Sequence, residues 1–227
     1  MALSGKNLSV IYRFDNSAAE TIAGSAVVTD VGSVKQPVLE VWRSLHPRFV
    51  ASHPMAGTAS AGVEAGQAGL FRGRPWIATP EAGTDPAALD VVRSLAQCLG
   101  SRWHTASAEQ HDQAVALISH MPVLVSAALL RTAGDERDPE IRQLAQSLAS
   151  SGFSDSTRIG GGNPDLGVAM ASSNSAAVLK ALAAYRWSLE QLEDAVLRNN
   201  WQQLHRELQR TQSLRPDYQQ TSSSDAP

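Results

Sequence analysis

Strand-forming segments stop near residue 106 of this 227-residue chain and do not return. Before that point, short β-branched runs alternate with helical patterns, and beyond it the apolar segments have helical spacing. Alternating strands and helices indicate an α/β sheet domain, whereas helices alone indicate a bundle. The sequence therefore predicts an α/β domain over residues 1–106 and an all-helical domain over residues 107–217.

The first half contains three short apolar strand candidates, at residues 25–29, 49–52 and 76–79. Helices are expected over residues 34–45, with Pro37 in the first turn, and over residues 85–99, which Asp-Pro begins and Gly100 ends. The one cysteine, Cys98, lies in the apolar pattern of the second helix and is predicted to be a buried small hydrophobe rather than a nucleophile.

The second half opens with residues 108–130, a run that is apolar on nearly every side, as is typical of a helix buried in a bundle or dimer. Pro122 is expected to kink it. Four more helices are predicted, over residues 139–151, 165–171, 176–199 and 201–214, the first of them closed by Gly152. The polar end of the chain, residues 218–227, is expected to be disordered.

Composition excludes some classes of partner. A net charge of −3 gives no broad attraction to nucleic acid or anionic lipid, so a small molecule or a protein is the expected partner. No window holds the ~18 consecutive apolar residues of a membrane span, and the first thirty residues lack a signal-peptide pattern. A cytoplasmic location is expected.

His53 is the first candidate functional residue. It lies in residues 50–62 (VASHPMAGTASAG), at a strand end followed by residues with very small side chains. This leaves space for a ligand against the imidazole, whose ordinary pKa of ~6.5 suits a general base. The alternative is a surface-loop histidine without a role.

Residues 29–35 (TDVGSVK) follow the first strand, where open α/β sheets bind ligands, so Ser33 beside Gly32 is well placed to touch a ligand or His53. Ser33 could instead be a plain helix N-cap. It could also be the nucleophile of a hydrolase with His53 as its base, but no G-x-S-x-G motif surrounds it.

Residues 151–167 (SGFSDSTRIGGGNPDLG) form the most suggestive loop of the second half, because Arg158 between glycine-rich turns could bind a carboxylate with both ends of its guanidinium. A solvent-exposed arginine is the alternative. The run Gly160–Gly162 alone is a weak phosphate signal. His111 and His120 are nine residues apart, which at ~100° per residue places them on opposite helix faces, so no metal site is predicted.

Taken together and in order, these stretches resemble the prephenate/arogenate dehydrogenase family of tyrosine biosynthesis. The resemblance rests on residues 29–35 (TDVGSVK), 52–57 (SHPMAG), 70–71 (LF), 75–80 (PWIATP), 111–122 (HDQAVALISHMP) and 151–158 (SGFSDSTR). It is greatest for the NADP-linked, arogenate-using branch. Val123 follows Met121-Pro122 where prephenate-using relatives commonly have a histidine.

The resemblance implies a Rossmann-like nucleotide-binding domain followed by a helical domain that forms a homodimer. It implies that the substrate, arogenate or prephenate, loses hydride to NADP, or to NAD, and its ring carboxylate as CO₂. His53 matches the histidine that accepts the hydroxyl proton, Ser33 the serine that hydrogen-bonds near that hydroxyl, and Arg158 the arginine that holds a substrate carboxylate.

The remaining matched residues have less definite roles. On the same resemblance Gly152, Asp155, His111 and His120 are expected at the substrate, and Asp30, Gly32 and Ser33 at the cofactor. Enzymes of this kind begin with a strand, G-x-G-x-x-G and a helix, a motif that this sequence does not contain. We expect a chain truncated before its first βαβ unit, and a catalytically inactive dimeric remnant that cannot bind the dinucleotide is the alternative.

Overall fold

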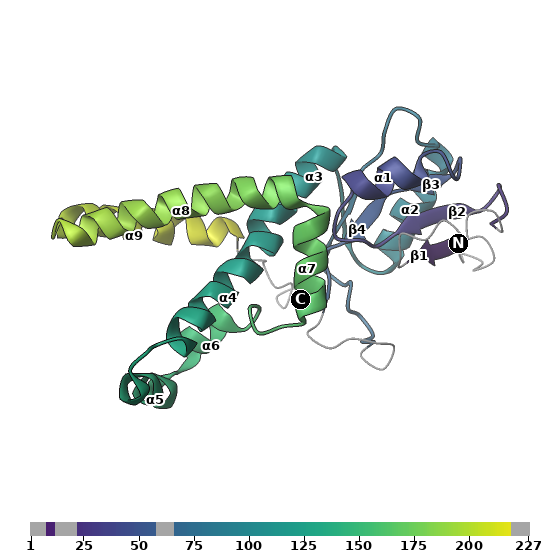
Figure 1. Ribbon diagram of the computed structural model, residues 1–227. Coiled ribbons are helices and arrows are strands. Elements are labelled where there is room, and N and C mark those ends of the chain that lie inside the picture. Colours follow the sequence, from purple (N-terminus) through teal and green to yellow (C-terminus); the bar gives the residue numbers. More distant parts are fainter. Residues whose placement is uncertain (1–7, 12–21, 58–65, 219–227) are drawn as a thin grey trace, which may run out of the picture. The chain divides into compact units, whose positions relative to one another are not determined.

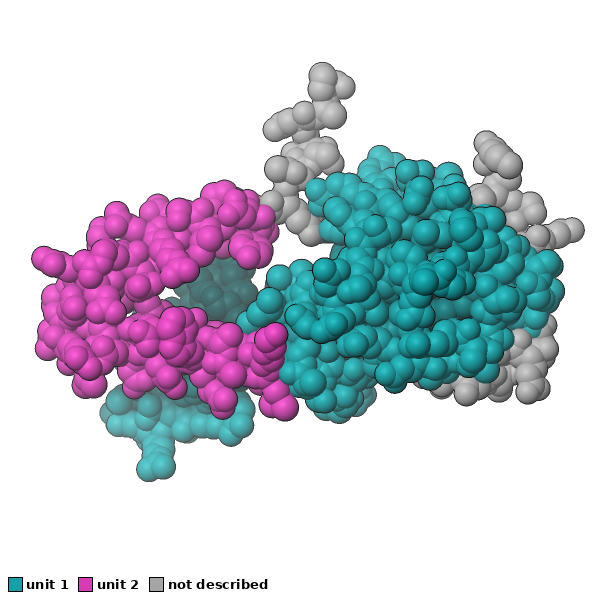
Figure 2. All heavy atoms as spheres, turned by 90° about the horizontal axis from the view of Figure 1, so that it is seen from above, with its two compact units in different colours: residues 1–178 teal, residues 179–227 magenta. Residues whose placement is uncertain are grey.

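The computed structural model describes residues 8–11, 22–57 and 66–218 (Figure 1). The predicted disordered end therefore lies outside the described residues, apart from residue 218. By their internal contacts the residues form two compact units, residues 1–178 and 179–227, which are coloured separately in Figure 2. Every described strand precedes residue 106, as the predicted division between sheet and helices requires.

The described strands form two three-stranded sheets. In the first, β1 (Leu8–Ile11), β2 (Val27–Asp30) and β3 (Phe49–Val50) are parallel, in that order. In the second, β4 (Ser52–Pro54) pairs antiparallel with β5 (Pro75–Ala78), which pairs parallel with β6 (Arg102–Thr105). Ala51 alone separates β3 from β4, so one extended segment passes from the first sheet into the second.

Helices cover both faces of this sheet region. Helix α1 (Gln36–Trp42) packs Val38, Leu39 and Trp42 against Val28 and Phe49. On the other side, α2 (Pro86–Cys98) packs Ala88 and Val92 against Val27, Val50 and Ala78. Successive strand residues point to opposite faces, which is why Val27 and Val28 enter different clusters. The predicted α/β class is confirmed, while β1 and β6 were not predicted.

Cys98 is exposed, so the prediction that it is buried was wrong. The buried residues of α2 are Ala88, Val92 and Ala96, which are spaced four apart along one helix face. Cys98 lies two residues beyond Ala96, about 200° further around the helix. The apolar residues next to Cys98 in the sequence therefore lie on a helix face that is partly exposed to solvent.

The second half begins with one long helix composed of α3 (Ala108–Val115), a π-helical turn η3 (Ala116–His120) and α4 (Met121–Gly134). The π turn ends two residues before Pro122, where a kink was predicted. This helix is long enough and has a high enough mean hydropathy to cross a membrane. It was not predicted as a span from the sequence, because its apolar residues do not form an unbroken run. The bent pair α7 (Pro164–Ser173) and α8 (Ser175–Leu197) passes the same test only when joined, across a 99° break.

The remaining helices are α5 (Pro139–Leu148), α6 (Ser151–Thr157), α9 (Trp201–Leu214) and the 3₁₀ turn η4 (Arg215–Tyr218). The start of the predicted loop at residues 151–167 is helical, and Gly152 lies inside α6 instead of closing α5. Between α8 and α9 the chain turns at Asn199, whose φ of 54° is left-handed, a conformation that asparagine tolerates.

Candidate active site

His53 lies in β4, where it pairs with Ile77, and its side chain is half-buried. Its Nδ1 is 2.9 Å from Nε2 of His111, a residue of α3 that is 2% exposed. Nδ1 of His111 is in turn 2.7 Å from Oδ1 of Asp112. Three side chains from two distant segments thus form one hydrogen-bonded row, with His53 at its outer end.

Asp112 connects this row to the start of α1. Its Oδ1 accepts the backbone N–H of Lys35 at 2.7 Å, and its Oδ2 accepts that of Gln36 at 2.9 Å. The first N–H groups of a helix have no partner within the helix, so a carboxylate from elsewhere satisfies them and also interacts favourably with the helix dipole. Asn174, which lies between α7 and α8, donates its side-chain N–H to the Asp112 carbonyl oxygen at 2.7 Å. This hydrogen bond fixes the backbone of Asp112.

A buried ion pair lies beside His53. The Lys35 ammonium, which is fully buried, donates to Oδ2 of Asp30 and to the Ser52 carbonyl oxygen at 2.7 Å. Burial lowers the pKa of Lys35, and the negative charges of Asp30 and Asp112 oppose that shift. The pair therefore holds the end of β2 against the backbone that carries His53.

Asp30 and Gly32 were expected at the cofactor. The Asp30 carboxylate accepts from Lys35 and from the backbone N–H groups of Gly32 and Ser52, both at 2.9 Å, so its hydrogen bonds are made within the protein. A Cβ on Gly32 would lie 3.0 Å from Asp30 Oδ2, which explains the glycine. The backbone of this turn, rather than the Asp30 side chain, remains available to a ligand.

Ser33 is half-buried in the turn between β2 and α1, and its hydroxyl makes no hydrogen bond to another residue in the described part of the chain. The alternative that Ser33 is the helix N-cap is wrong, because the N-cap position of α1 is Lys35. Asp112 takes over the capping role, and the Ser33 hydroxyl is left free for a ligand.

The environment keeps His53 neutral. Burial is the main cause that lowers its pKa to about 3, and positive charge on His111, Lys35 and His120 acts in the same direction. A neutral imidazole has one nitrogen without a proton. At pH values well above 3, His53 is therefore neutral and can present a lone pair to a bound molecule.

His111 and His120 are both about 2% exposed, which places the two predicted substrate residues inside the protein. A π turn lies between them, so the ~100° per residue of a regular α-helix, on which the expectation of opposite faces rested, does not hold over the whole interval. Asn174 Nδ2 lies 3.3 Å from Nδ1 of His120 as well as bonding Asp112. His120 Nε2 has no hydrogen-bond partner among the described residues, and burial lowers the pKa of this histidine.

Arg158, Asp155 and Gly152 are exposed residues of α6 and its C-terminal end. No hydrogen bond or ion pair joins them to the His53 row within the described ranges. The loop after Arg158 is fixed to α4, because Gly160 N–H donates to Ser126 Oγ at 2.8 Å and this hydroxyl donates to the Ser156 carbonyl at 2.9 Å.

Comparison with known proteins identifies the family. The nucleotide-binding domain of prephenate dehydrogenase matches residues 9–105, and the dimerisation domain of prephenate dehydrogenase matches residues 107–210. The chain belongs to the prephenate dehydrogenase family. The family assignment and the predicted fold class are confirmed.

Several relatives belong to this prephenate dehydrogenase family. Cyclohexadienyl dehydrogenase of Zymomonas mobilis is 32% identical over 181 residues, 78% of this chain and 61% of that protein. Prephenate dehydrogenase of Bacillus subtilis is 32% identical over 157 residues, 68% of this chain and 42% of that protein. The chain thus spans less than two thirds of the length of these curated relatives.

Solved structures of the family superpose closely. Synechocystis arogenate dehydrogenase is 44% identical, with a TM-score of 0.81, covering 90% of this chain and 73% of that one. Prephenate dehydrogenase from Aquifex aeolicus, in complex with hydroxyphenyl propionate and NAD⁺, is 28% identical, with a TM-score of 0.86, covering 94% and 77%.

The sequence signals of the prephenate dehydrogenase family led to His53 and Ser33 but did not reveal what supports them. Asp112, Lys35 and Asn174 were missed as parts of the site. Their partners lie 77, 17 and 62 residues away along the chain. One local signal was available, the adjacent pair His111-Asp112, since histidine beside carboxylate is a common arrangement for fixing a ring nitrogen.

Proposed function

We propose that this chain carries the active-site residues of an arogenate or prephenate dehydrogenase. The observation that carries the proposal is His53, a neutral and half-buried base. Its Nδ1 is hydrogen-bonded to His111, while its Nε2 makes no hydrogen bond to another described residue. In a family of dehydrogenases such a group suits removal of a hydroxyl proton.

In the proposed reaction, His53 Nε2 accepts the proton of the substrate's ring hydroxyl. The carbon that carries this hydroxyl becomes oxidised as its hydrogen leaves as hydride. The ring carboxylate departs as CO₂, and aromatisation makes the overall step downhill. Ser33 hydrogen-bonds near the reacting hydroxyl and Arg158 holds a carboxylate of the substrate. A bound nicotinamide dinucleotide supplies the hydride acceptor.

The residues present fit the nicotinamide end of such a cofactor. The turn formed by residues 30–33 follows the parallel strand β2, and ligands of open α/β sheets bind at such strand ends. Gly32 keeps this turn free of a side chain next to the unengaged Ser33 hydroxyl. The sequence contains no G-x-G-x-x-G, so these residues do not account for a pyrophosphate cradle. NADP is the proposed cofactor, with NAD as the second choice.

Arogenate is the proposed substrate in preference to prephenate. Val123 follows Met121-Pro122 at the position where prephenate-using relatives commonly carry a histidine. The 44% identity to the Synechocystis arogenate dehydrogenase, against 28% to the Aquifex prephenate dehydrogenase, supports the same choice.

The test is an initial-rate assay of the full chain with each pair of arogenate or prephenate and NADP⁺ or NAD⁺, followed by the absorbance of the reduced nicotinamide. The arogenate and NADP⁺ pair should be fastest. A calorimetric titration with NADP⁺ runs in parallel, and micromolar binding is expected. A chain that shows no NADP⁺ binding and no turnover with any pair would overturn the proposal. The catalytically inactive dimeric remnant would then be the alternative, and the missing glycine motif supports it.

Arg158→Ala should raise the KM for arogenate, which carries two carboxylates, about tenfold to a hundredfold. The reason is that a charge-assisted bidentate hydrogen bond contributes about 2–3 kcal/mol to binding. Arg158→Lys keeps the charge and loses the planar fork, so its KM should lie between those of the other two proteins. Steady-state kinetics with arogenate measure both. An unchanged KM in Arg158→Ala removes this residue from the proposed site.

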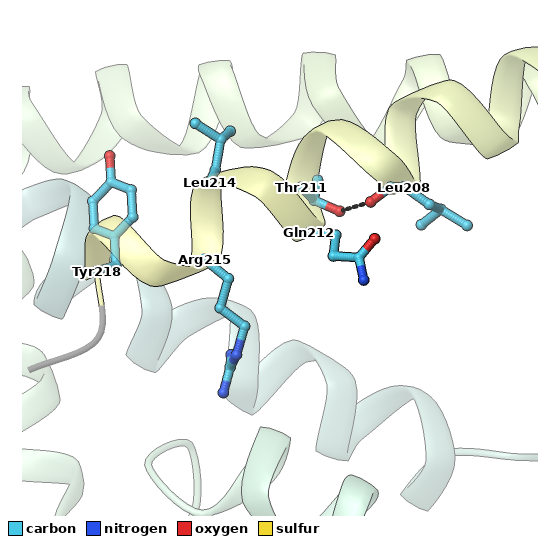
Figure 3. Close-up of a pocket in the computed structure, with 6 residues that line it drawn as sticks. All are labelled: Leu208, Thr211, Gln212, Leu214, Arg215 and Tyr218. Atoms are coloured by element: carbon cyan, nitrogen blue, oxygen red, sulfur yellow. Dashed lines mark hydrogen bonds between the residues drawn. The ribbon is translucent and has the colours of Figure 1, made fainter.

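We also propose that residues 107–217 form the homodimer interface of a cytoplasmic enzyme, with residues 1–106 as the nucleotide-binding part. Large apolar side chains are exposed on several helices, among them Leu144, Leu148, Trp187 and Leu189. At the end of α9, Leu214 and Tyr218 project from the same side of the chain and help to line a hollow (Figure 3). Such surfaces are typical of protein interfaces. Sedimentation equilibrium should give twice the chain mass, and a monomer at micromolar concentration contradicts this proposal.

A further inference from the structure

We infer that His111 and Asp112 are positioning residues that keep the proton of neutral His53 on Nδ1, so that Nε2 is the nitrogen that accepts the substrate's proton. The inference rests on the proposed function and deepens it, because it assigns the base to a single atom. It follows from the order of donors and acceptors along the row formed by Asp112, His111 and His53.

The proton positions follow from Asp112. Its carboxylate accepts two backbone N–H groups, from Lys35 and Gln36, so both oxygens act as acceptors. His111 Nδ1, at 2.7 Å from Oδ1, must therefore be the donor. An imidazole whose one proton is on Nδ1 has a bare Nε2, which can only accept.

The same logic continues to His53. Its Nδ1 lies 2.9 Å from the bare Nε2 of His111, so this Nδ1 must donate and His53 Nε2 is left with a free lone pair. The opposite tautomer of His53 would place two lone pairs face to face at that distance. In a buried site, unpaired acceptors of this kind cost about 1–3 kcal/mol, enough to favour one tautomer at least fivefold.

This arrangement differs from the tautomer that histidine prefers in water, where Nε2 carries the proton. His53 without His111 would thus tend to present an N–H, rather than a lone pair, to the substrate hydroxyl. When His53 accepts a proton, the Nδ1–H bond to His111 and the nearby Asp112 carboxylate stabilise the resulting imidazolium. The role matches that of the aspartate in a serine-protease triad, with one histidine interposed.

The row is held independently of any ligand. His111 is 2% exposed and Asp112 1% exposed, and Asp112 is bonded to α1 and to Asn174. The His53 and His111 rings meet edge to face, with their planes 71° apart and their centroids 5.1 Å apart. Neither His111 nor Asp112 needs to touch the substrate, which revises the expectation that His111 is a substrate-binding residue.

The experiment uses His111→Leu, which removes the acceptor, and His111→Gln, whose side-chain oxygen can still accept from His53 Nδ1. We expect His111→Leu to lower kcat about a hundredfold or more with KM changed less than about threefold, and His111→Gln to recover at least tenfold of the loss. His104→Leu, which alters an exposed histidine of β6, is the matched control and should leave both constants unchanged.

Nitrogen-15 spectra of the histidine-labelled full chain measure the tautomer directly and need no substrate. His53, assigned by its loss in His53→Asn, should show a protonated Nδ1 and a bare Nε2, and His111→Leu should move the proton toward Nε2. A wild-type proton on Nε2 overturns the inference, as does a fall in kcat while the tautomer stays unchanged. If His111→Leu does not fold, His111→Gln and the wild-type spectrum decide. If the wild-type chain has no dehydrogenase activity but His53 carries its proton on Nδ1, the proposed function is wrong and the inference about the tautomer stands.

Discussion

Gly160→Ala should lower the free energy of unfolding by about 3 kcal/mol or more, the upper range for an overpacked interior site. A Cβ on Gly160 would lie 2.3 Å from the backbone nitrogen of Ala127 and 2.4 Å from the backbone carbon of Ser126. Those atoms belong to the backbone of α4, which cannot rotate away as a flexible side chain would. Either the loop separates from α4 or the helix distorts.

Gly161→Ala is the matched control. A Cβ there would meet Leu130 Cδ1 at 3.7 Å and the Thr157 carbonyl oxygen at 4.0 Å, both ordinary van der Waals contacts. Urea unfolding of the three proteins at one protein concentration measures the difference, because the stability of a dimer depends on concentration. Equal stability of Gly160→Ala and Gly161→Ala would show that the loop does not need this close contact with α4.

This contact also changes the meaning of the glycine run at residues 160–162. From the sequence the run was a weak phosphate signal, whereas in the structure Gly160 packs the loop after Arg158 onto α4 and hydrogen-bonds Ser126 Oγ. We therefore expect Gly160→Ala to raise the KM for substrate as well, since it displaces the segment that carries Arg158.

The fold could be predicted from the sequence wherever a pattern is local. Asp85-Pro86 and Gly100 bracket α2 correctly, and the division between strands and helices near residue 106 follows from periodicity alone. The polar strand β6 was missed because its exposed residues do not alternate with apolar ones. Helix α6 was missed because its serine and glycine content is typical of a loop, and its burial of Thr157 depends on contacts elsewhere.

The candidate site was predictable only in its outer members. His53 and Ser33 lie in short stretches whose small residues and position at strand ends indicate a ligand. The row behind His53 was not predictable, because it depends on a π turn before His120 and on a carboxylate that caps a helix 76 residues earlier in the chain. Hydrophobic periodicity predicts neither the π turn nor the long-range carboxylate cap.

His53→Asn should lower kcat by about 10²–10⁴-fold, the usual contribution of a general base. Asparagine is short enough to fit the space of the imidazole, and its amide can donate to His111 as Nδ1 does, so the row behind it is preserved. What it lacks is the nitrogen that occupies the Nε2 position. NADP⁺ binding, measured by calorimetry, should therefore stay within about threefold of wild type.

The control for this substitution is His104→Asn, which places the same change at an exposed position of β6 and should leave kcat unaltered. The two variants separate a chemical role from a general effect of losing a histidine. If His53→Asn retains the wild-type kcat, another group removes the hydroxyl proton. His120, whose buried Nε2 has no partner among the described residues, would then be the next side chain to test. A large loss in His53→Asn with unchanged NADP⁺ affinity leaves proton removal as the step that fails.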